Sequence, residues 1–140
     1  MFRIDYATEE DKAFWFTLEQ HMDESEFWLK VRDKRAYIIS DSEKPVGIMR
    51  YNLFWDNAPC LTMLYLVEAY RKKGFGAKAM AHWENEMRRC GYKFVITTTQ
   101  VDEAAQHFYR RLGYKDAGGF LIEVPSFEQP MEMFMIKLLT

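Results

Sequence analysis

The stretch of sequence that most restricts the possible folds runs from Tyr65 to Trp83, YLVEAYRKKGFGAKAMAHW. An apolar run ends there in three consecutive cations, and two glycines one residue apart follow at the start of a predicted helix. Adjacent cations repel one another and glycine disfavours helix, so local stability does not explain the arrangement. Backbone N–H groups at such a helix start lack partners and bind phosphate oxygens well. The pattern therefore predicts a strand, a turn that binds an anion at residues 71–77, and a helix.

Three glycine-rich phosphate turns compete for this segment. A P-loop requires Gly-x-x-x-x-Gly-Lys-Ser/Thr, and the spacing here is different. The dinucleotide fingerprint Gly-x-Gly-x-x-Gly/Ala matches GFGAKA, Gly74 to Ala79, but it belongs to the first turn of a parallel sheet and needs an acidic residue after the next strand. That strand ends in the neutral VITTTQ. The third turn, Arg/Gln-x-x-Gly-x-Gly/Ala, fits RKKGFGA; a tight turn with solvated cations is the remaining alternative.

Hydrophobic periodicity predicts strands and helices along the rest of the chain. Seven segments have strand patterns: residues 2–6, 35–40, 46–55, 60–67, 93–99, 116–124 and 131–139. Four helices are expected: one that begins near Thr8 and Asp11, one from Asp23 to about Arg32, one between the glycine turn and Gly91, and one between Asp102 and Gly113. This order predicts a mixed α+β fold in a single domain over residues 1–140.

The apolar stripes of the last two helices predict their buried faces. The expected stripe after the glycine turn is Ala77, Met80, Ala81, Glu84 and Met87. The expected stripe after Asp102 is Ala104, Ala105, Phe108, Tyr109 and Leu112. Asp102 is expected to cap the second of these helices at its N-terminus, and Gly113 to end it in a left-handed conformation.

Composition limits the partners and the compartment. The net charge of −2 gives no general attraction to nucleic acid or to an anionic membrane, and no apolar run approaches the roughly 20 residues of a membrane span. The N-terminus MFRIDYATEED lacks a signal-peptide core, and Cys60 and Cys90 have no metal-ligand spacing. We therefore expect a cytoplasmic protein with reduced cysteines, no metal, and no nucleic-acid or membrane partner.

Three features together resemble one family. LYLVEAYRKKGFGAKAM, the strand after it, and DEAAQHFYRRLGY are similar to the acetyl-CoA-binding half of the GNAT superfamily of N-acetyltransferases. The similarity is tight from Leu61 to about Tyr114, and the flanking elements follow the family's order. It implies a three-layer α/β arrangement of about four helices around a mixed, mostly antiparallel sheet of about seven strands. That sheet is expected to splay open between the strands at 61–67 and 93–99.

The same resemblance implies acetyl-CoA as co-substrate, bound in that gap. Its pantetheine arm would pair with the backbone of Leu64 to Leu66, because an unpaired strand edge offers N–H and C=O groups, and its pyrophosphate would rest on the amides of Lys72 to Ala77. The implied cofactor-binding residues are Leu64, Tyr65, Leu66, Arg71, Lys72, Lys73, Gly74, Phe75, Gly76, Ala77 and Asp102. Asp102 departs from the family's usual asparagine: an ionised aspartate cannot donate a hydrogen bond, so a plain capping role stays open.

Acetyl transfer from a thioester to an amine requires a neutral amine, a stabilised carbonyl oxygen and a proton for the departing thiolate. A backbone N–H near Leu66 could polarise the carbonyl. Tyr109 matches the family tyrosine that commonly protonates the thiolate, and a tyrosine with a reference pKa of about 10 carries its proton at neutral pH. The alternative for Tyr109 is a core position beside Leu112.

A general base is missing from the strand where some family members carry a glutamate, because this chain has threonines within Phe94–Thr99. At pH 7 a lysine-type amine costs roughly 4.6 kcal/mol to deprotonate and an α-amine only about 1.4 kcal/mol. A low-pKa amine, or a base elsewhere, is therefore the easier case. Glu68 and Asp56 are candidates, although acids at such positions are usually only solvated.

The histidines and tryptophans carry weaker signals. His21, His82 and His107 show no metal spacing and no pairing with a nucleophile, and we assign them no site. His107 could line the acceptor cleft, but a surface position is expected. Trp15, Trp28 and the Trp55–Asn57 turn could also line that cleft, with the hydrophobic core as the alternative for the tryptophans.

We therefore predict an acetyl-CoA-dependent N-acetyltransferase. It would move acetyl to a primary amine of an unidentified acceptor, a small molecule or a protein amine, by direct attack with Tyr109 as general acid. One alternative is a non-catalytic acyl-CoA-binding or regulatory module of the same fold. Another is a dinucleotide-binding protein, against which the antiparallel start and the missing ribose acid argue. A homodimer remains open.

Overall fold

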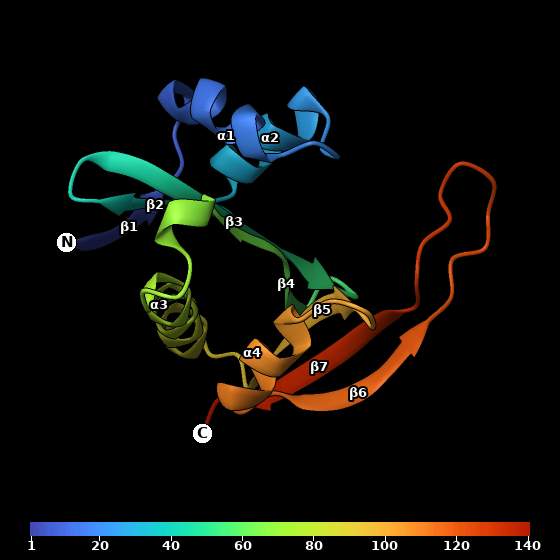
Figure 1. The fold of residues 1–140 in the computed structure, drawn as a ribbon. Coiled ribbons are helices and arrows are strands. Elements are labelled where there is room, and N and C mark those ends of the chain that lie inside the picture. Colours follow the sequence, from blue (N-terminus) through green and yellow to red (C-terminus); the bar gives the residue numbers. More distant parts are fainter.

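The computed structural model describes residues 1–140 as seven strands, four α-helices and two short 3-10 turns (Figure 1). The strands are β1 (Phe2–Tyr6), β2 (Ala36–Asp41), β3 (Lys44–Phe54), β4 (Ala58–Leu66), β5 (Phe94–Gln100), β6 (Lys115–Phe120) and β7 (Glu132–Leu138). The helices are α1 (Lys12–Leu18), α2 (Glu24–Arg32), α3 (Phe75–Arg89) and α4 (Ala105–Arg111), and the 3-10 turns are η1 (Glu9–Asp11) and η2 (Glu68–Tyr70). The predicted order of elements is confirmed.

All seven strands belong to one sheet, in the order β1-β2-β3-β4-β5-β7-β6. Only β4 and β5 pair in parallel; every other pair is antiparallel. The parallel pair needs a crossover, which α3 supplies, whereas short turns suffice for the hairpins. The mixed, mostly antiparallel α+β fold is therefore confirmed.

The helices cover the two faces of the sheet in separate pairs. Helices α1 and α2 pack on one face, against a cluster that includes Ile38 and Ile48, and α3 and α4 cover the other face (Figure 1). Ile39, the next residue along β2, belongs to the cluster under α3, because successive side chains of a strand point to opposite faces. The sheet therefore carries a core on each side.

Helix α3 is fixed to the sheet by two buried carboxylates as well as by apolar packing. Glu84 accepts hydrogen bonds from the hydroxyl of Tyr114 at 2.8 Å and from Nζ of Lys137 at 2.7 Å. Glu86 accepts hydrogen bonds from the hydroxyls of Tyr6 and Tyr37. A buried charge is costly unless it is hydrogen-bonded, so these partners orient the helix as well as stabilise it.

The buried face of α3 differs in part from the predicted stripe. Met80, Glu84 and Met87 are buried as expected, but Ala81 is exposed, and the fully buried positions include Ala79 and Trp83. The predicted stripe counted Ala81 and omitted Trp83, whose indole packs against Tyr51 with ring centroids 5.7 Å apart. The large side chain that reaches the sheet sets the rotation of the helix.

Two other local predictions are corrected. Helix α4 begins at Ala105 after an uncapped Ala104, so Asp102 is not its cap. The Glu103 carboxylate instead accepts from the backbone N–H of Gln100 at 3.3 Å, and this closes the turn before the helix can start. Strand β6 ends at Phe120, short of residue 124, and a long loop follows.

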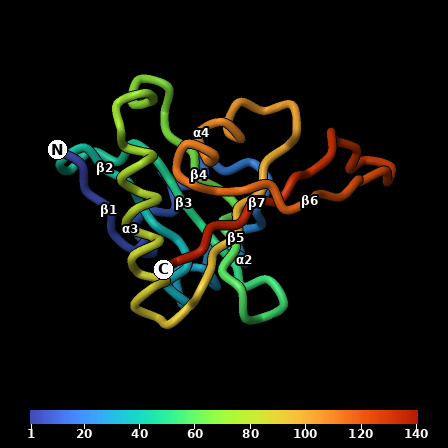
Figure 2. The backbone as a smooth tube through the Cα atoms, turned by 90° about the horizontal axis from the view of Figure 1, so that it is seen from below, coloured from blue at the N-terminus to red at the C-terminus, as the bar shows by residue number.

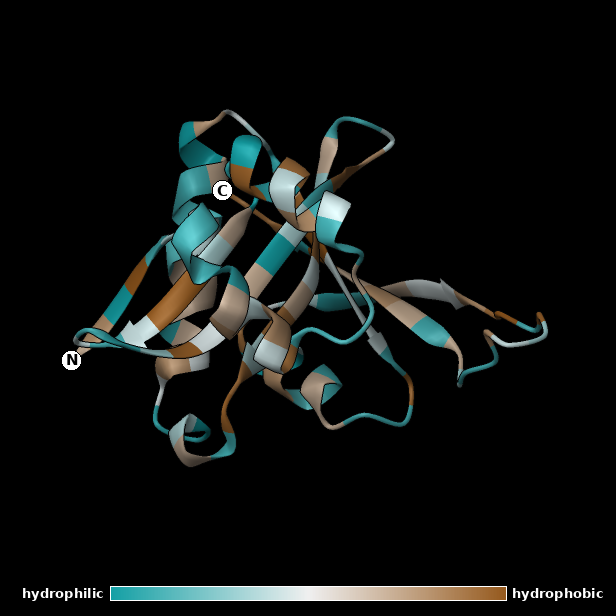
Figure 3. Cartoon of the chain, turned by 90° about the horizontal axis from the view of Figure 1, so that it is seen from above, coloured by the Kyte–Doolittle hydropathy of each residue, from teal (hydrophilic) through white to brown (hydrophobic).

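The β6–β7 hairpin extends beyond the body of the fold, and its connecting loop, residues 121–131, lies on the same side of the sheet as α1 and α2 (Figures 1 and 2). In Figure 3 hydrophobic residues follow the central strands, and some also occur in this loop, where Leu121 and Phe127 are exposed. None of the helices has the length and apolar character that crossing a bilayer requires.

Candidate active site

A gap opens in the middle of the sheet, between β4 and β5. The two strands pair only at Cys60 with Ile96 and at Leu61 with Thr97. Just beyond, the pairing of β3 and β4 shifts between Arg50 and Tyr51, which leaves Thr62 as an extra residue in β4. Such a bulge bends its strand, so β4 turns away from β5. The predicted splay is confirmed, and the edge of β4 after Leu61 has no strand beside it.

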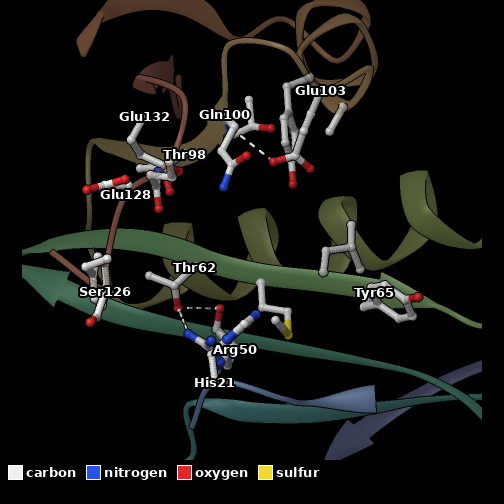
Figure 4. Close-up of a pocket in the computed structure, with 17 residues that line it drawn as sticks. His21, Arg50, Thr62, Tyr65, Thr98, Gln100, Glu103, Ser126, Glu128 and Glu132 are labelled. Atoms are coloured by element: carbon white, nitrogen blue, oxygen red, sulfur yellow. Dashed lines mark hydrogen bonds between the residues drawn. The ribbon is translucent and has the colours of Figure 1, made fainter. Parts of the chain in front are cut away.

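A pocket of about 750 Å³ occupies this gap (Figure 4). Its walls come from β4, from β5 and α4, and from the loop before β7 with the start of that strand. His21 of the α1–α2 connection and Arg50 of β3 complete them. The lining residues are His21, Arg50, Thr62, Met63, Leu64, Tyr65, Thr98, Thr99, Gln100, Glu103, Ala105, Tyr109, Ser126, Phe127, Glu128, Gln129 and Glu132. Leu64, Tyr65 and Tyr109 were predicted from the sequence; most of the others were not.

The glycine turn leaves its backbone N–H groups free. None of the amides of residues 72–77 donates a hydrogen bond within the protein. Gly74 has φ +84°, a left-handed conformation that side chains disfavour, and Gly76 approaches Phe108 so closely that an added Cβ would lie 3.3 Å from its ring. Glycine is therefore favoured at both positions, by backbone conformation at Gly74 and by close packing at Gly76, and the turn offers a row of donors at the start of α3.

The three cations before the turn are not neutralised by any carboxylate. Arg71 instead donates from Nε to the backbone oxygen of Leu66 at 3.0 Å, and its guanidinium lies over the ring of Tyr65, 5.0 Å from the centroid. Lys73 lies 5.3 Å from the ring centroid of Tyr70. Arg71 thus connects the glycine turn to the end of β4 that enters the pocket.

Tyr109 lies at the apex of the gap, close to the point where β4 and β5 part. It is 6% exposed and lines the pocket. Burial raises the pKa of Tyr109 above its usual value, and the neighbouring Thr97 side chain partly opposes this shift. Oγ1 of Thr97 is itself buried and lies outside the pocket lining. The apex therefore holds a protonated phenol with a buried threonine hydroxyl beside it.

A buried ion pair forms the opposite wall. Nε of Arg50 donates to Glu19 at 2.7 Å, and its Nη1 donates to the hydroxyl of Thr62, the bulge residue, also at 2.7 Å. Glu19 follows α1 and also accepts from the backbone N–H of His21 at 3.3 Å. The Glu19 side chain is fully buried. The connection between α1 and α2 is thereby tied to the bulge of β4.

Carboxylates line the remaining sides of the pocket. Glu103 begins the turn into α4, and Glu128 and Glu132 come from the loop before β7 and from the start of that strand (Figure 4). Nε2 of Gln129 donates to Glu132 at 2.8 Å, which orders this segment. No group of three or more His, Cys, Asp or Glu side chains is arranged to hold a metal ion.

Several predicted candidates lie away from the pocket. Asp56 is exposed in the β3–β4 turn and Glu68 is exposed in η2, so neither base candidate lines it. Trp15 is fully buried under α1, and Trp28 packs against the same cluster. Three further residues are exposed and outside the lining: Trp55, Asp102 and His107.

Sequence analysis assigned no role to His21, Arg50 or Glu132. One available signal was Arg50, a charged residue in the middle of the apolar run VGIMRYNLFW. A charge at a buried strand position needs a partner or a function. His21 and Glu132 carry no comparable signal, because only the packing of their elements brings them to the pocket.

Comparison with known proteins agrees with this geometry. Residues 4–114 match the family described as Acetyltransferase (GNAT) family. No curated protein matches the chain significantly in sequence. The GNAT fold expected from the sequence is confirmed by this family match together with the solved structures that the chain resembles.

Many solved structures have the same fold. Naa50 of Arabidopsis thaliana, in complex with a bisubstrate analogue CoA-Ac-MVNAL, superposes with a TM-score of 0.81 at 12% identity over 97% of both chains. The ribosomal-protein-alanine N-acetyltransferase of Brucella melitensis gives 0.79 at 20% identity, over 97% of this chain and 99% of that one. The ribosomal-protein-S18-alanine N-acetyltransferase of Escherichia coli gives 0.79 at 14% identity, over 100% and 95%. With its family match, its splayed sheet and its free-amide turn, the chain belongs to the acetyltransferase (GNAT) family.

Proposed function

We propose that this protein transfers the acetyl group of acetyl-CoA to a primary amine by direct attack, with Tyr109 as general acid. The observation that carries the proposal is the continuity of the site. The turn with the free amides of residues 72–77 lies beside the end of β4, where Gly76 approaches Leu66 and Arg71 binds the backbone oxygen of that residue. The unpaired edge of β4 leads from there into the pocket that Tyr109 lines. An extended cofactor with phosphates at one end and a thioester at the other fits this order.

In this proposal each part of the cofactor has a defined partner. The pyrophosphate binds the amides of Lys72 to Ala77, with Arg71, Lys72 and Lys73 adding positive charge. The pantetheine arm pairs with the backbone of Leu64 to Leu66, as an added strand would. Bound in this way, the thioester lies at the apex of the gap beside Tyr109. Asp102, which is exposed, stays a cofactor-binding prediction.

The acceptor nitrogen attacks the thioester carbonyl carbon, a C–N bond forms and the C–S bond breaks. The departing sulfur takes the proton of Tyr109, and water returns a proton to the tyrosine and removes the one that the amine loses. Reference pKa values of about 10 and 8.5 make the transfer to sulfur uphill by roughly 2 kcal/mol. Burial raises the pKa of Tyr109, so the phenol keeps its proton at neutral pH until the thiolate departs.

The acceptor that suits this site best is an α-amine. The threonines of β5 supply no carboxylate beside the thioester, and an α-amine costs about 3 kcal/mol less to deprotonate at pH 7 than a lysine side chain. Fold relatives point in the same direction: Naa50 was solved with a peptide bisubstrate analogue, and two others are ribosomal-protein-alanine N-acetyltransferases. We therefore place peptide or protein N-termini first among the acceptors.

Tyr109→Phe tests the proposal, because it removes one hydroxyl and keeps the ring. With acetyl-CoA and a panel of amines that includes peptide α-amines, thiol release should fall by about 10²–10⁴-fold, the range typical of a general acid. CoA affinity measured by calorimetry should change little. Tyr92→Phe, the same change at a tyrosine outside the pocket, is the control. A folded Tyr109→Phe variant with turnover within about threefold of the parent would leave water as the proton donor.

A further inference from the structure

A charged side chain lies within an otherwise apolar stretch of β3, and its contacts lead to the bulge of β4. Arg50 shares a face of the sheet with Ile48, which packs under α1 and α2, because residues two apart in a strand point the same way. The Arg50 side chain is 15% exposed, and that of its partner Glu19 is 0% exposed. Desolvation offsets most of the attraction in an ion pair at this depth, so stability alone is a weak reason for it.

The two ends of this ion pair are anchored to different elements. Glu19 follows the last turn of α1, where its backbone N–H donates to the oxygen of Trp15 at 2.9 Å. Arg50 donates to Glu19 and to the hydroxyl of Thr62, both at 2.7 Å, and that hydroxyl lies 3.4 Å from the backbone oxygen of Arg50 (Figure 4). Thr62 is the extra residue of the bulge. The bulge is therefore held by a side chain that the end of α1 holds in turn.

The bulge decides which backbone groups of β4 face the gap. The N–H of Val67, the residue after β4, donates to the oxygen of Val46 on the β3 side at 2.8 Å. Successive residues of a strand direct their N–H and C=O groups to opposite neighbours, so those of Leu64 and Leu66 face away from β3. The oxygen of Leu66 agrees with this, because it accepts from Arg71 at 3.0 Å. Leu64 therefore carries the first backbone N–H beyond the bulge that opens into the gap.

This N–H suits the carbonyl oxygen of the thioester. A pantetheine arm that pairs along Leu64 to Leu66 ends at Leu64, and both Leu64 and Tyr109 line the pocket. The carbonyl oxygen gains negative charge during attack, and a donor that is misplaced by about 1 Å can cost on the order of 10²-fold in rate. A register change of one residue would turn the Leu64 N–H towards β3. The position of the bulge therefore matters to the chemistry.

We propose that Arg50 is a positioning residue for acetyl transfer. It fixes the bulge of β4 through the hydroxyl of Thr62, and the fixed bulge aims the N–H of Leu64 at the thioester carbonyl oxygen. Glu19 holds the guanidinium of Arg50 in this place. The inference rests on the proposed function and adds to it residues that act on the reacting atoms through the backbone of a strand.

Thr62→Val tests the proposal, because it removes the hydroxyl and keeps the branched shape of the side chain. Single-turnover acetylation of an alanyl peptide should slow by about 10–10²-fold, while CoA affinity measured by calorimetry changes little. Thr62→Ser keeps a hydroxyl and should keep most of the rate. Thr17→Val is the matched control: it removes a hydroxyl that donates to a backbone oxygen at 2.6 Å outside the pocket, and it should keep the parent rate.

Infrared spectroscopy separates positioning from a merely structural effect. A hydrogen bond to the carbonyl oxygen polarises the C=O bond, so the stretching frequency of acetyl-CoA labelled with ¹³C at the acetyl carbonyl should fall when it binds the parent protein. Thr62→Val should return this frequency towards that of free acetyl-CoA, and Thr62→Ser should not. The double variant Glu19→Gln/Arg50→Met removes both buried charges together and should act in the same direction as Thr62→Val.

The outcomes distinguish this inference from the proposed function. A Thr62→Val protein or double variant that keeps the parent carbonyl frequency would overturn the positioning role, even if its turnover falls. A raised KM for the peptide alone would then assign Arg50 to the acceptor site. A Thr62→Ser protein as slow as Thr62→Val would overturn the role of the hydroxyl. A parent protein that shifts the carbonyl frequency but acetylates no amine would overturn the proposed function itself.

Discussion

The ring of Tyr114 packs edge-on against the ring of Tyr109, with centroids 5.7 Å apart and planes at 62°. The hydroxyl of Tyr114 donates to Oε2 of Glu84 at 2.8 Å, and Lys137 binds the other oxygen of that carboxylate. The surface on which the proposed general acid rests is therefore fixed by a buried carboxylate of α3. Tyr114 is a positioning residue, since it does not line the pocket.

Tyr114→Phe should lower stability more than it lowers chemistry. The change removes one hydrogen bond from a buried carboxylate, at a cost of about 1–3 kcal/mol, while the ring packing against Tyr109 stays. Urea unfolding measures the first effect and single-turnover acetylation the second. A loss of turnover as large as that of Tyr109→Phe, in a stable protein, would show that Tyr114 itself takes part in proton transfer.

Replacing Gly74 and Gly76 by valine should weaken CoA binding at least tenfold, about 1.4 kcal/mol. The side chains would strain the turn and cover its free amides. Gly91→Val is a matched control, because Gly91 also has a left-handed φ, +92°, with open space around it, at the other end of α3. Unchanged calorimetric CoA affinity in the folded double variant would refute the phosphate site, and tight binding of NADH would favour a dinucleotide site.

Glu19→Gln should destabilise the protein by about 3 kcal/mol, because it leaves Arg50 buried without its counter-ion. The double variant Glu19→Gln/Arg50→Met should be more stable than the single one. Since Arg50 also binds Thr62, the single variant should raise the acceptor KM more than the acetyl-CoA KM. Thermal unfolding measures the stability changes, and steady-state kinetics on the same samples measures the two KM values. Additive stability losses would indicate that the pair does not act as a unit.

Stability should fall above pH 10, in part through Tyr51. Burial, with a smaller contribution from the charge of Glu86, raises the pKa of Tyr51 to about 12. The unfolded chain releases this proton near pH 10, so below that pH the contribution is fully present, and between about pH 10 and 12 it declines by about 1–3 kcal/mol. Tyr51→Phe should flatten this decline in urea unfolding. The same change at the exposed Tyr65 should preserve it; equal slopes in both variants would contradict the assignment.

Local signals in the sequence predicted most of the elements. Backbone N–H of Thr8 donates to the Asp11 carboxylate at 2.8 Å, as the predicted helix start requires. Gly91 and Gly113 end their helices with φ of +92° and +97°. The turn with free amides at Gly74 was also predicted from the sequence. These features depend on residues within a few positions of one another, so the chain specifies them before any long-range contact forms.

The predictions of the α4 cap and of the buried face of α3 failed, because a local sequence signal competed there with contacts of neighbouring side chains. Asp102 is a good capping residue, but Glu103 binds the N–H of Gln100 and Gln106 binds the backbone oxygen of Val101 at 2.7 Å, so α4 starts later. The exposed Ala81 was assigned to the stripe of α3 because periodicity alone cannot fix a helix's rotation. Packing of Trp83 against Tyr51 decides it.

By itself the sequence determined the strand–turn–helix unit from which we predicted a phosphate site, because that unit lies in one short segment with its own pattern. Tyr109 became a candidate acid through the resemblance of its segment to the GNAT family. Only the tertiary structure brought His21, Arg50 and Glu132 into one pocket. These residues come from the α1–α2 connection, β3 and β7, and their meeting depends on the order β3-β4-β5-β7 and on the bulge at Thr62. A strand order and a gap are properties of the whole sheet, which no segment carries alone.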